Sequence, residues 1–255
     1  LQDTLRNPFE FASLPCWEPA LNRSVEEQIA LYKQADFREA LLADLEGDER
    51  DEVWDRIRVL DVTDPALESY RNRTIMEIAD AEGKRPRDVY LDIGIADGLN
   101  TRFQVQAFNY DIDGVERLVT DDRFMIGLGD GGAHVQMLCD AGYATALLEI
   151  WVRQRQALTL EKAVQKLTSV PATLYGIPDR GILAEGKVAD LVLFDPEKVS
   201  SKVPEYVRDF PLNSWRLVAG AEGIIATFVA GRQLYDNGIH TGEMPGRVLR
   251  SYEQS

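Results

Sequence analysis

Histidine is scarce in this sequence, since only His134 and His240 occur among 255 residues. A catalytic zinc ion takes about three protein ligands, usually including histidines, and the chain has neither an H-x-H nor an HExxH pattern. The two cysteines, Cys16 and Cys139, have no metal-ligand spacing and are too few for a disulfide framework. We therefore expect an incomplete zinc site and a reduced, cytoplasmic setting.

Positive charge is also in short supply, with 28 lysines and arginines against 43 aspartates and glutamates and a net charge of −15. Nucleic acids and anionic membranes bind positive surfaces, so we expect neither as a partner. No apolar run approaches the roughly 20 residues of a membrane span, and the amino terminus lacks the features of a signal peptide. The first residue is not methionine, which indicates a processed or truncated piece of a longer protein.

What the sequence does contain is typical of a globular protein, with 45% hydrophobic and 28% charged residues and no repeats or low-complexity segments. Ser24, followed three residues later by Glu27, predicts a capped helix. Gly83 is a natural end for a helix over 73–84. Pro171 is expected to end or kink an amphipathic helix over 159–176.

Strand and helix patterns alternate between residues 53 and 157. Strands are predicted over 53–62, 102–108 and 124–129, with helices between them and a long helix over 135–156. Strands joined by helical crossovers form parallel sheets, so this part of the chain is predicted to be α/β.

The pattern changes after Gly176, where two runs over 186–196 and 223–238 are rich in β-formers and bounded by glycine, proline or asparagine. We place a domain boundary near residue 178. The region 1–177 is then an α/β domain with an irregular and helical amino-terminal insertion, and 178–255 is a small β module with a carboxyl-terminal tail.

The stretch IGLGDGGAH, residues 126–134, allows three interpretations. Its glycines fit the G-x-G-x-x-G pattern of a dinucleotide site, but Asp130 would place a carboxylate beside the pyrophosphate and no second strand follows. It could be only a turn, because aspartate and glycine are common turn residues. It could also place Asp130 at the carboxyl end of a strand, where a carboxylate can bind a divalent metal and move a proton.

Several phrases resemble a known family. IGLGDGGAHV, LTSVPATLYGI, RGILAEGKVADLVLFDP and TGEMPGRVLR resemble the carboxyl-terminal half of the amidohydrolase superfamily, in the branch that contains N-acyl-D-amino-acid deacylases (D-aminoacylases). The resemblance implies the second half of a metal-dependent (β/α)8 barrel plus a small C-terminal β module. It also implies a divalent metal, usually zinc, and hydrolysis of an amide bond by metal-activated hydroxide.

Asp130 matches the family aspartate that ends the eighth barrel strand, binds metal and shuttles the proton. We therefore predict Asp130 as the catalytic residue and as a metal ligand, and His134, Gly131 and Gly132 as substrate-binding residues. Asn109 lies at the carboxyl end of the predicted strand over 102–108, on the side where active sites form, so we predict it as a substrate-binding residue as well. The family's other metal ligands precede this stretch and have no counterpart here. The three predicted strands also leave an open sheet edge. We therefore expect a missing amino-terminal half of the barrel, or an oligomeric partner, to cover that edge.

Three functions remain open at this point. The first is the carboxyl-terminal part of a hydrolase that acts on N-acyl amino acids or related amides, a small-molecule substrate, and that is inactive as the isolated fragment. The second is a binding or scaffold protein that keeps the half-barrel without the metal site. The third is a dinucleotide-binding protein.

Overall fold

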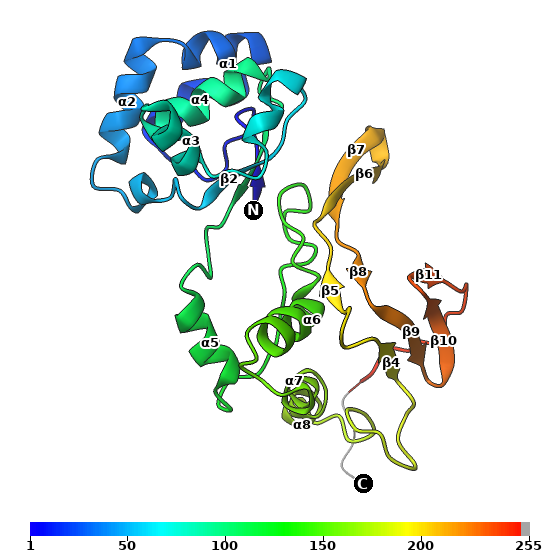
Figure 1. Cartoon of the computed structure of the whole chain (residues 1–255). Helices are drawn as coiled ribbons and strands as arrows, with labels where there is room; N and C mark the ends of the chain where they lie inside the picture. The colour runs from blue at the N-terminus through cyan, green and yellow to red at the C-terminus, as the bar shows by residue number, and fades with distance from the viewer. Residues whose placement is uncertain (251–255) are drawn as a thin grey trace. The chain divides into compact units, whose positions relative to one another are not determined.

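The chain forms two compact units, one over Leu1–Tyr110 and one from Asp111 onward, in a computed structural model that describes residues 1–250 (Figure 1). The boundary predicted near residue 178 lies inside the second unit, and the independence of the β module stays a prediction. Within residues 1–250, no helix combines the length and the apolar character needed to cross a bilayer.

The first unit consists of helices and a short sheet. Its helices are α1 (Val25–Tyr32), α2 (Ala35–Leu45), α3 (Ile75–Glu82) and α4 (Pro86–Ala96), its 3-10 segments are Pro15–Ala20, Glu49–Glu52 and Pro65–Tyr70, and its strands are β1 (Gln2–Asp3), β2 (Ile57–Asp61) and β3 (Arg102–Val105).

The start of α1 and the end of α3 lie where the sequence predicts. The Glu27 backbone N–H donates to the Ser24 hydroxyl, and the Ser24 N–H donates in return to the Glu27 carboxylate, which is a complete capping box. Thr74 and Glu77 start α3 in the same way. That helix ends at Gly83, whose φ of 63° is left-handed, as predicted.

The sheet of the first unit has the order β1-β3-β2, and both pairings are antiparallel. The predicted parallel pairing of 53–62 with 102–108 is therefore wrong for this structure. In each strand, alternate residues face the buried side of the sheet, Val59 in β2 and Phe103 in β3 among them. These two residues are register partners. An antiparallel partner satisfies that alternation as well as a parallel one, so the pattern leaves strand direction undetermined. The half-barrel itself stays a prediction.

An aromatic cluster forms the core of the first unit. Trp17 contacts Tyr32 and Phe37 edge-on, with ring centroids 5.1 and 5.2 Å apart. Tyr90 and Phe103 lie closer still, at 4.4 Å. All five rings are buried, and aromatic rings carry a large apolar area, so this cluster contributes substantially to the unit's stability.

Asp3 is a carboxylate buried at the edge of this core. It accepts backbone N–H bonds from Thr4 at 2.6 Å and Glu10 at 3.3 Å. Burial raises the pKa of Asp3 from 3.8 to about 7, against the lowering effect of backbone hydrogen bonds. The folded state therefore holds a proton that the unfolded state releases above its own lower pKa, so stability is lost as pH rises towards the folded pKa.

We expect the unfolding free energy to fall between about pH 5 and about pH 8, and Asp3→Asn to remove this part of the pH dependence. Urea midpoints of both proteins at the two pH values measure it. Because Asp3→Asn keeps the other acidic residues, it also shows how much of the pH dependence comes from repulsion among them. Parallel pH profiles for the two proteins would contradict this prediction.

The second unit begins with helices and continues with strands. Its helices are α5 (Ile112–Thr120), α6 (Tyr143–Ala146) continued by the π-helical η4 (Leu147–Gln154), α7 (Leu160–Leu167) and α8 (Ser169–Leu174), and its strands are β4 (Leu191–Phe194), β5 (Ser200–Ser201), β6 (Glu205–Phe210), β7 (Ser214–Val218), β8 (Ala221–Glu222), β9 (Ile224–Val229), β10 (Arg232–Asp236) and β11 (Ile239–His240), with a 3-10 turn at Pro211–Asn213.

The β-rich character of the carboxyl-terminal part is confirmed. Strands β11-β10-β9-β4 form an antiparallel sheet, and β6 with β7 and β5 with β8 form two separate pairs (Figure 1). The predicted helix over 159–176 is also present, but it breaks at Thr168, three residues before Pro171. A proline clashes with the turn that precedes it, which accounts for a break on that side.

Two predictions about the segment before η4 are wrong. Residues 124–129 form no strand, and the helix predicted from residue 135 begins only at Tyr143. A short apolar strand needs hydrogen-bonding neighbours for its backbone, and none of the described strands pairs with 124–129. Gly142 and the turns before it interrupt the predicted helix, because glycine lowers helix stability.

The buried core of the second unit is small and leaves apolar surface uncovered. It centres on Leu147, Leu148 and Trp151, which pack with Ala163. Several large apolar side chains of this unit are exposed, among them Leu128, Leu174, Tyr175, Leu183, Val192 and Leu193. Exposed apolar groups in such numbers are typical of surfaces that a partner covers.

Candidate functional site

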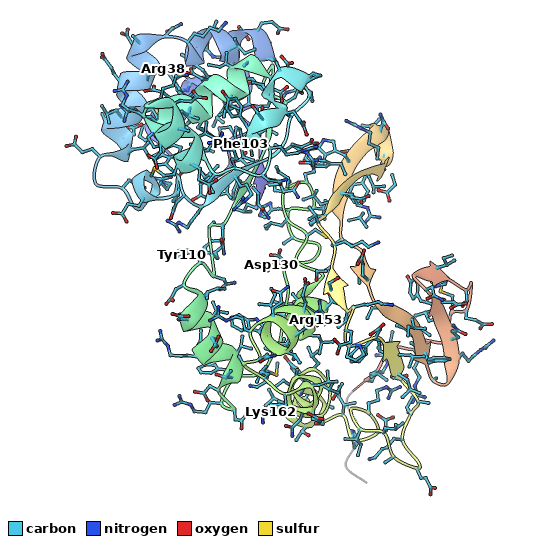
Figure 2. The ribbon with its side chains drawn as sticks, in the orientation of Figure 1. Arg38, Phe103, Tyr110, Asp130, Arg153 and Lys162 are labelled. Atoms are coloured by element: carbon cyan, nitrogen blue, oxygen red, sulfur yellow. The ribbon has the colours of Figure 1, made fainter. Side chains whose placement is uncertain are left out.

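The predicted catalytic residue lies on the loop that joins α5 to α6, where Figure 2 labels Asp130. Buried Lys166 on α7 fixes the start of this loop, because its ammonium donates to the carbonyls of Asp121 at 2.7 Å and Phe124 at 2.9 Å. Further along, the Ala133 N–H donates to the Asp130 carbonyl, which closes a turn. The loop is therefore ordered by hydrogen bonds at both places.

The glycines of the loop allow close packing of the chain on itself. A Cβ on Gly129 would lie 2.4 Å from the Asp140 carbonyl oxygen, and one on Gly131 would lie 3.2 Å from the Cβ of Ala141. Gly132 has a φ of 107°, which disfavours other residues. Close packing and turn geometry therefore account for these glycines. This agrees with the second of the three interpretations of residues 126–134, that of a turn.

Asp130 and His134 have exposed side chains. Asp130 does not follow a strand, so the predicted placement at a strand's carboxyl end is not what this structure has. His134 has a φ of 44°, and its carbonyl accepts from the Met137 N–H. The catalytic role of Asp130 and the substrate contacts of His134, Gly131 and Gly132 stay predictions.

Asn109 belongs to the first unit and follows β3 in sequence. Its φ is 58°, its side chain is exposed, and its carbonyl accepts a hydrogen bond from the Gln106 side chain. A left-handed asparagine is common in turns, which accounts for this residue without a ligand. Its predicted role in substrate binding stays a prediction.

Metal ligands do not gather in the described residues. Among the side chains that the structure describes, no group of three or more histidine, cysteine, aspartate or glutamate residues is placed to hold a metal ion. The Nδ1 atom of His240 accepts from the Gly242 N–H at 2.9 Å, which engages it within the chain. The donors in the described part of the chain therefore do not fit a zinc centre by themselves.

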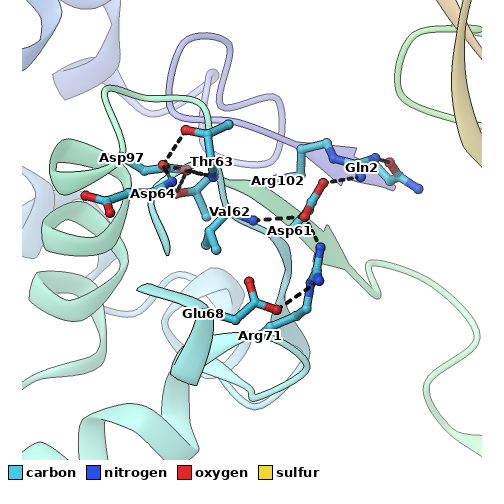
Figure 3. Close-up of polar contacts among 10 residues, drawn as sticks. Gln2, Asp61, Val62, Thr63, Asp64, Glu68, Arg71, Asp97 and Arg102 are labelled. Atoms are coloured by element: carbon cyan, nitrogen blue, oxygen red, sulfur yellow. Dashed lines mark hydrogen bonds and ion pairs between the residues drawn. The ribbon is translucent and has the colours of Figure 1, made fainter. Parts of the chain in front are cut away.

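A polar network that the sequence analysis did not identify lies where β2 ends in the first unit (Figure 3). Asp61 receives hydrogen bonds from Arg71 and from Arg102, the latter at 2.7 Å. Burial would raise the pKa of Asp61, but these two guanidinium groups outweigh it and lower the pKa. Gln2 completes the network by accepting from Arg102.

Asp97 forms a second set of bonds beside this network. Its buried carboxylate accepts from the Thr63 N–H and hydroxyl, the Asp64 N–H and the Thr101 hydroxyl (Figure 3). Four donors saturate the carboxylate, so Asp97 ties α4 to the loop after β2. Asp61 ends β2 and Asp97 directly follows α4, and the hydrogen bonds that each accepts assign both a structural role.

A cavity of about 840 Å³ lies in the second unit, lined by residues that include Glu149, Arg153 and Thr227. The first two are engaged in holding the chain. Glu149 accepts from the Ser201 N–H, and Arg153 donates to the Val199 carbonyl at 2.6 Å. Neither Asp130 nor His134 lines this cavity, so it does not extend the predicted catalytic loop.

Comparison with known proteins decides the family. The model of the amidohydrolase family matches residues 20–235, which is most of the chain and includes the loop of Asp130. The chain belongs to the amidohydrolase family.

The amidohydrolase chain is similar to three curated deacylases of Alcaligenes xylosoxydans xylosoxydans. It is 38% identical to an N-acyl-D-aspartate deacylase over 42% of this chain and 20% of the relative. It is 32% identical to an N-acyl-D-glutamate deacylase over 56% of this chain and 28% of the relative. It is 30% identical to a D-aminoacylase over 69% of this chain and 34% of the relative. The matched part is thus about a fifth to a third of each relative's length.

Solved structures of deacylases also match this chain, with low structural overlap. A D-aminoacylase described with a binuclear metal centre is 24% identical and covers 92% of this amidohydrolase chain and 48% of its own, with a TM-score of 0.46. The N-acyl-D-glutamate deacylase of Bordetella bronchiseptica, solved with zinc and a phosphonate inhibitor, is 23% identical to this chain. The match covers 89% of this chain and 52% of the deacylase, with a TM-score of 0.43.

Proposed function

We propose that this chain is the carboxyl-terminal part of a hydrolase that cleaves the amide bond of N-acyl amino acids, with D-amino acids as the favoured class. The observation that carries the proposal is the family match over residues 20–235 together with three deacylases among the curated relatives. In the whole protein, Asp130 would take a proton from the attacking water and return it to the leaving amine.

The remaining metal ligands are proposed to come from outside the described residues. Two observations support this. No three-donor cluster exists within 1–250, and the second unit exposes large apolar side chains, including Val192 and Leu193 of β4. The amino-terminal part of the same protein would supply the ligands for a divalent metal, zinc by preference, and would cover this apolar surface. A cytoplasmic setting is proposed on the two free cysteines.

A scaffold without catalysis is the second candidate, and the missing donor cluster is the observation that favours it. The dinucleotide alternative has no such support, because residues 124–129 form no strand and 131–137 form turns where the binding helix would start.

The test compares the chain alone with the chain joined to the coding sequence upstream of Leu1. We expect the joined protein to bind zinc in stoichiometric amount and to hydrolyse N-acetyl-D-glutamate or N-acetyl-D-aspartate faster than the L-isomers. The chain alone should do neither. Metal analysis and amine release measure the two properties. Hydrolysis by the chain alone would contradict the divided site, and a folded joined protein with neither property would favour the scaffold.

A further inference from the structure

A second cavity lies entirely within the first unit. None of its lining residues belongs to the predicted catalytic loop over 126–134. Its volume is about 530 Å³, and it is lined by the polar side chains of Arg6, Asn7, Asn22, Arg23, Ser24 and Gln28 with two apolar residues, Leu21 and Val25. We call it the Arg6–Arg23 pocket. Its volume is in the range of about 300–1,000 Å³ that is usual for small-molecule sites.

The charge of this pocket is unusual for the molecule. The chain carries 43 acidic and 28 basic side chains, and most of its arginines are paired with carboxylates or bonded to carbonyls. Arg6 and Arg23 form no ion pair with any described carboxylate, and both are exposed at the pocket. Two guanidinium groups left unpaired in so acidic a protein indicate an anion that arrives from solution.

The walls of the pocket are held in place by buried polar contacts. Gln28 is only 3% exposed, and its amide nitrogen donates to the carbonyls of Arg6 and Ala20, each at 3.1 Å. The Tyr32 hydroxyl donates to the Leu5 carbonyl at 3.0 Å, beside Arg6 in sequence. The segments that carry the two arginines are therefore both attached to α1, which fixes their backbones before a ligand binds.

Glu27, the acidic residue on which Arg23 acts electrostatically, is already engaged. Glu27 accepts from the Ser24 N–H, and this bond together with the Ser24 hydroxyl is the main reason that the pKa of Glu27 is lowered. Arg23 adds to the lowering without forming an ion pair with Glu27. The glutamate charge thus serves the start of α1 and leaves the guanidinium groups available to a ligand.

We propose that the Arg6–Arg23 pocket binds a phosphate ester of metabolite size. Two guanidinium groups match the double negative charge of a phosphate group and can bond to its oxygens. A ligand with a single carboxylate has only one negative charge and would not match both groups. Asn7, Asn22 and Ser24 also line the pocket, and their amide and hydroxyl groups can both donate and accept hydrogen bonds with the remainder of the ligand. The volume exceeds what a free ion needs, since one water takes about 30 Å³. This site is independent of the proposed hydrolase activity.

Titration calorimetry on the full chain tests this, with glucose 6-phosphate as the probe and with inorganic phosphate, glucose and acetate as comparisons at matched ionic strength. We expect the ester to bind more tightly than inorganic phosphate, and glucose and acetate to give no heat. Arg6→Gln and Arg23→Gln should each weaken binding by about tenfold or more, because each removes a charge-assisted contact.

Lys33→Gln is the matched control, since it removes the same charge from an exposed side chain at the other end of α1. It should leave the affinity within about twofold. Equal weakening by Lys33→Gln, or no binding of either phosphate by the correctly folded chain, would overturn the site. Equal affinity for ester and inorganic phosphate would overturn the assignment to an ester. Circular dichroism checks that each variant is folded.

Discussion

Replacing Asp130 with asparagine is expected to lower the kcat of the whole amidohydrolase by about 10²- to 10⁴-fold, the usual contribution of a general acid–base group. Asparagine has nearly the same shape as aspartate but cannot accept a proton at neutral pH. Because the Asp130 side chain is exposed, the substitution should change the unfolding free energy by less than about 0.5 kcal/mol. Steady-state amide hydrolysis and thermal unfolding measure the two effects separately.

Asp140→Asn is the control for this experiment. Asp140 is an exposed aspartate on the same loop, so its substitution makes the same change of charge. We expect it to keep kcat within about twofold of the parent. A full kcat in Asp130→Asn, or an equal loss in both variants, would show that proton transfer does not depend on Asp130.

The loop of Asp130 marks where prediction from the sequence stops. The turn residues and their glycines were identified from local chemistry, since aspartate and glycine favour turns wherever they occur. The strand expected over 124–129 depends on neighbours in a sheet, and the described chain offers it none. A residue's place at the end of a strand is therefore not encoded by the strand's own apolar residues.

Helix ends were predictable for the opposite reason. The capping boxes of Ser24 and Thr74 and the left-handed Gly83 satisfy backbone groups within a few residues of themselves. Such contacts form without distant partners, so a short window of sequence contains the information.

Long-range polar contacts were missed because their partners are far apart in sequence. Asp61 and Arg102 form an ion pair at 2.7 Å, and the Thr63 hydroxyl donates to Asp97. Nothing in the spacing of these residues indicates that they meet. The Arg6–Arg23 pocket was missed for the same reason, since Gln28 joins its walls only in the folded chain.

The second large effect is expected for Phe103→Ala, which should reduce the unfolding free energy of the first unit by about 3–5 kcal/mol. Phe103 has no exposed surface, lies 4.4 Å from Tyr90 between ring centroids, and sits on the strand that pairs with both neighbours in the sheet. Removing the ring takes away apolar contacts on several sides, and the strands fixed on each side prevent the space from closing.

Phe108→Ala is the matched control, because Phe108 lies five positions further along the same stretch and is 78% exposed. It removes the same atoms from water rather than from the core, so the expected loss is below about 0.5 kcal/mol. Urea unfolding gives the free energies, and hydrogen exchange of peptides from residues 1–110 assigns the loss to the first unit. A loss below about 1 kcal/mol in Phe103→Ala would mean that the aromatic cluster is loosely packed. An equal loss in both variants would mean that Phe108 is buried, which would place β3 and the residues after it in a larger sheet than β1-β3-β2.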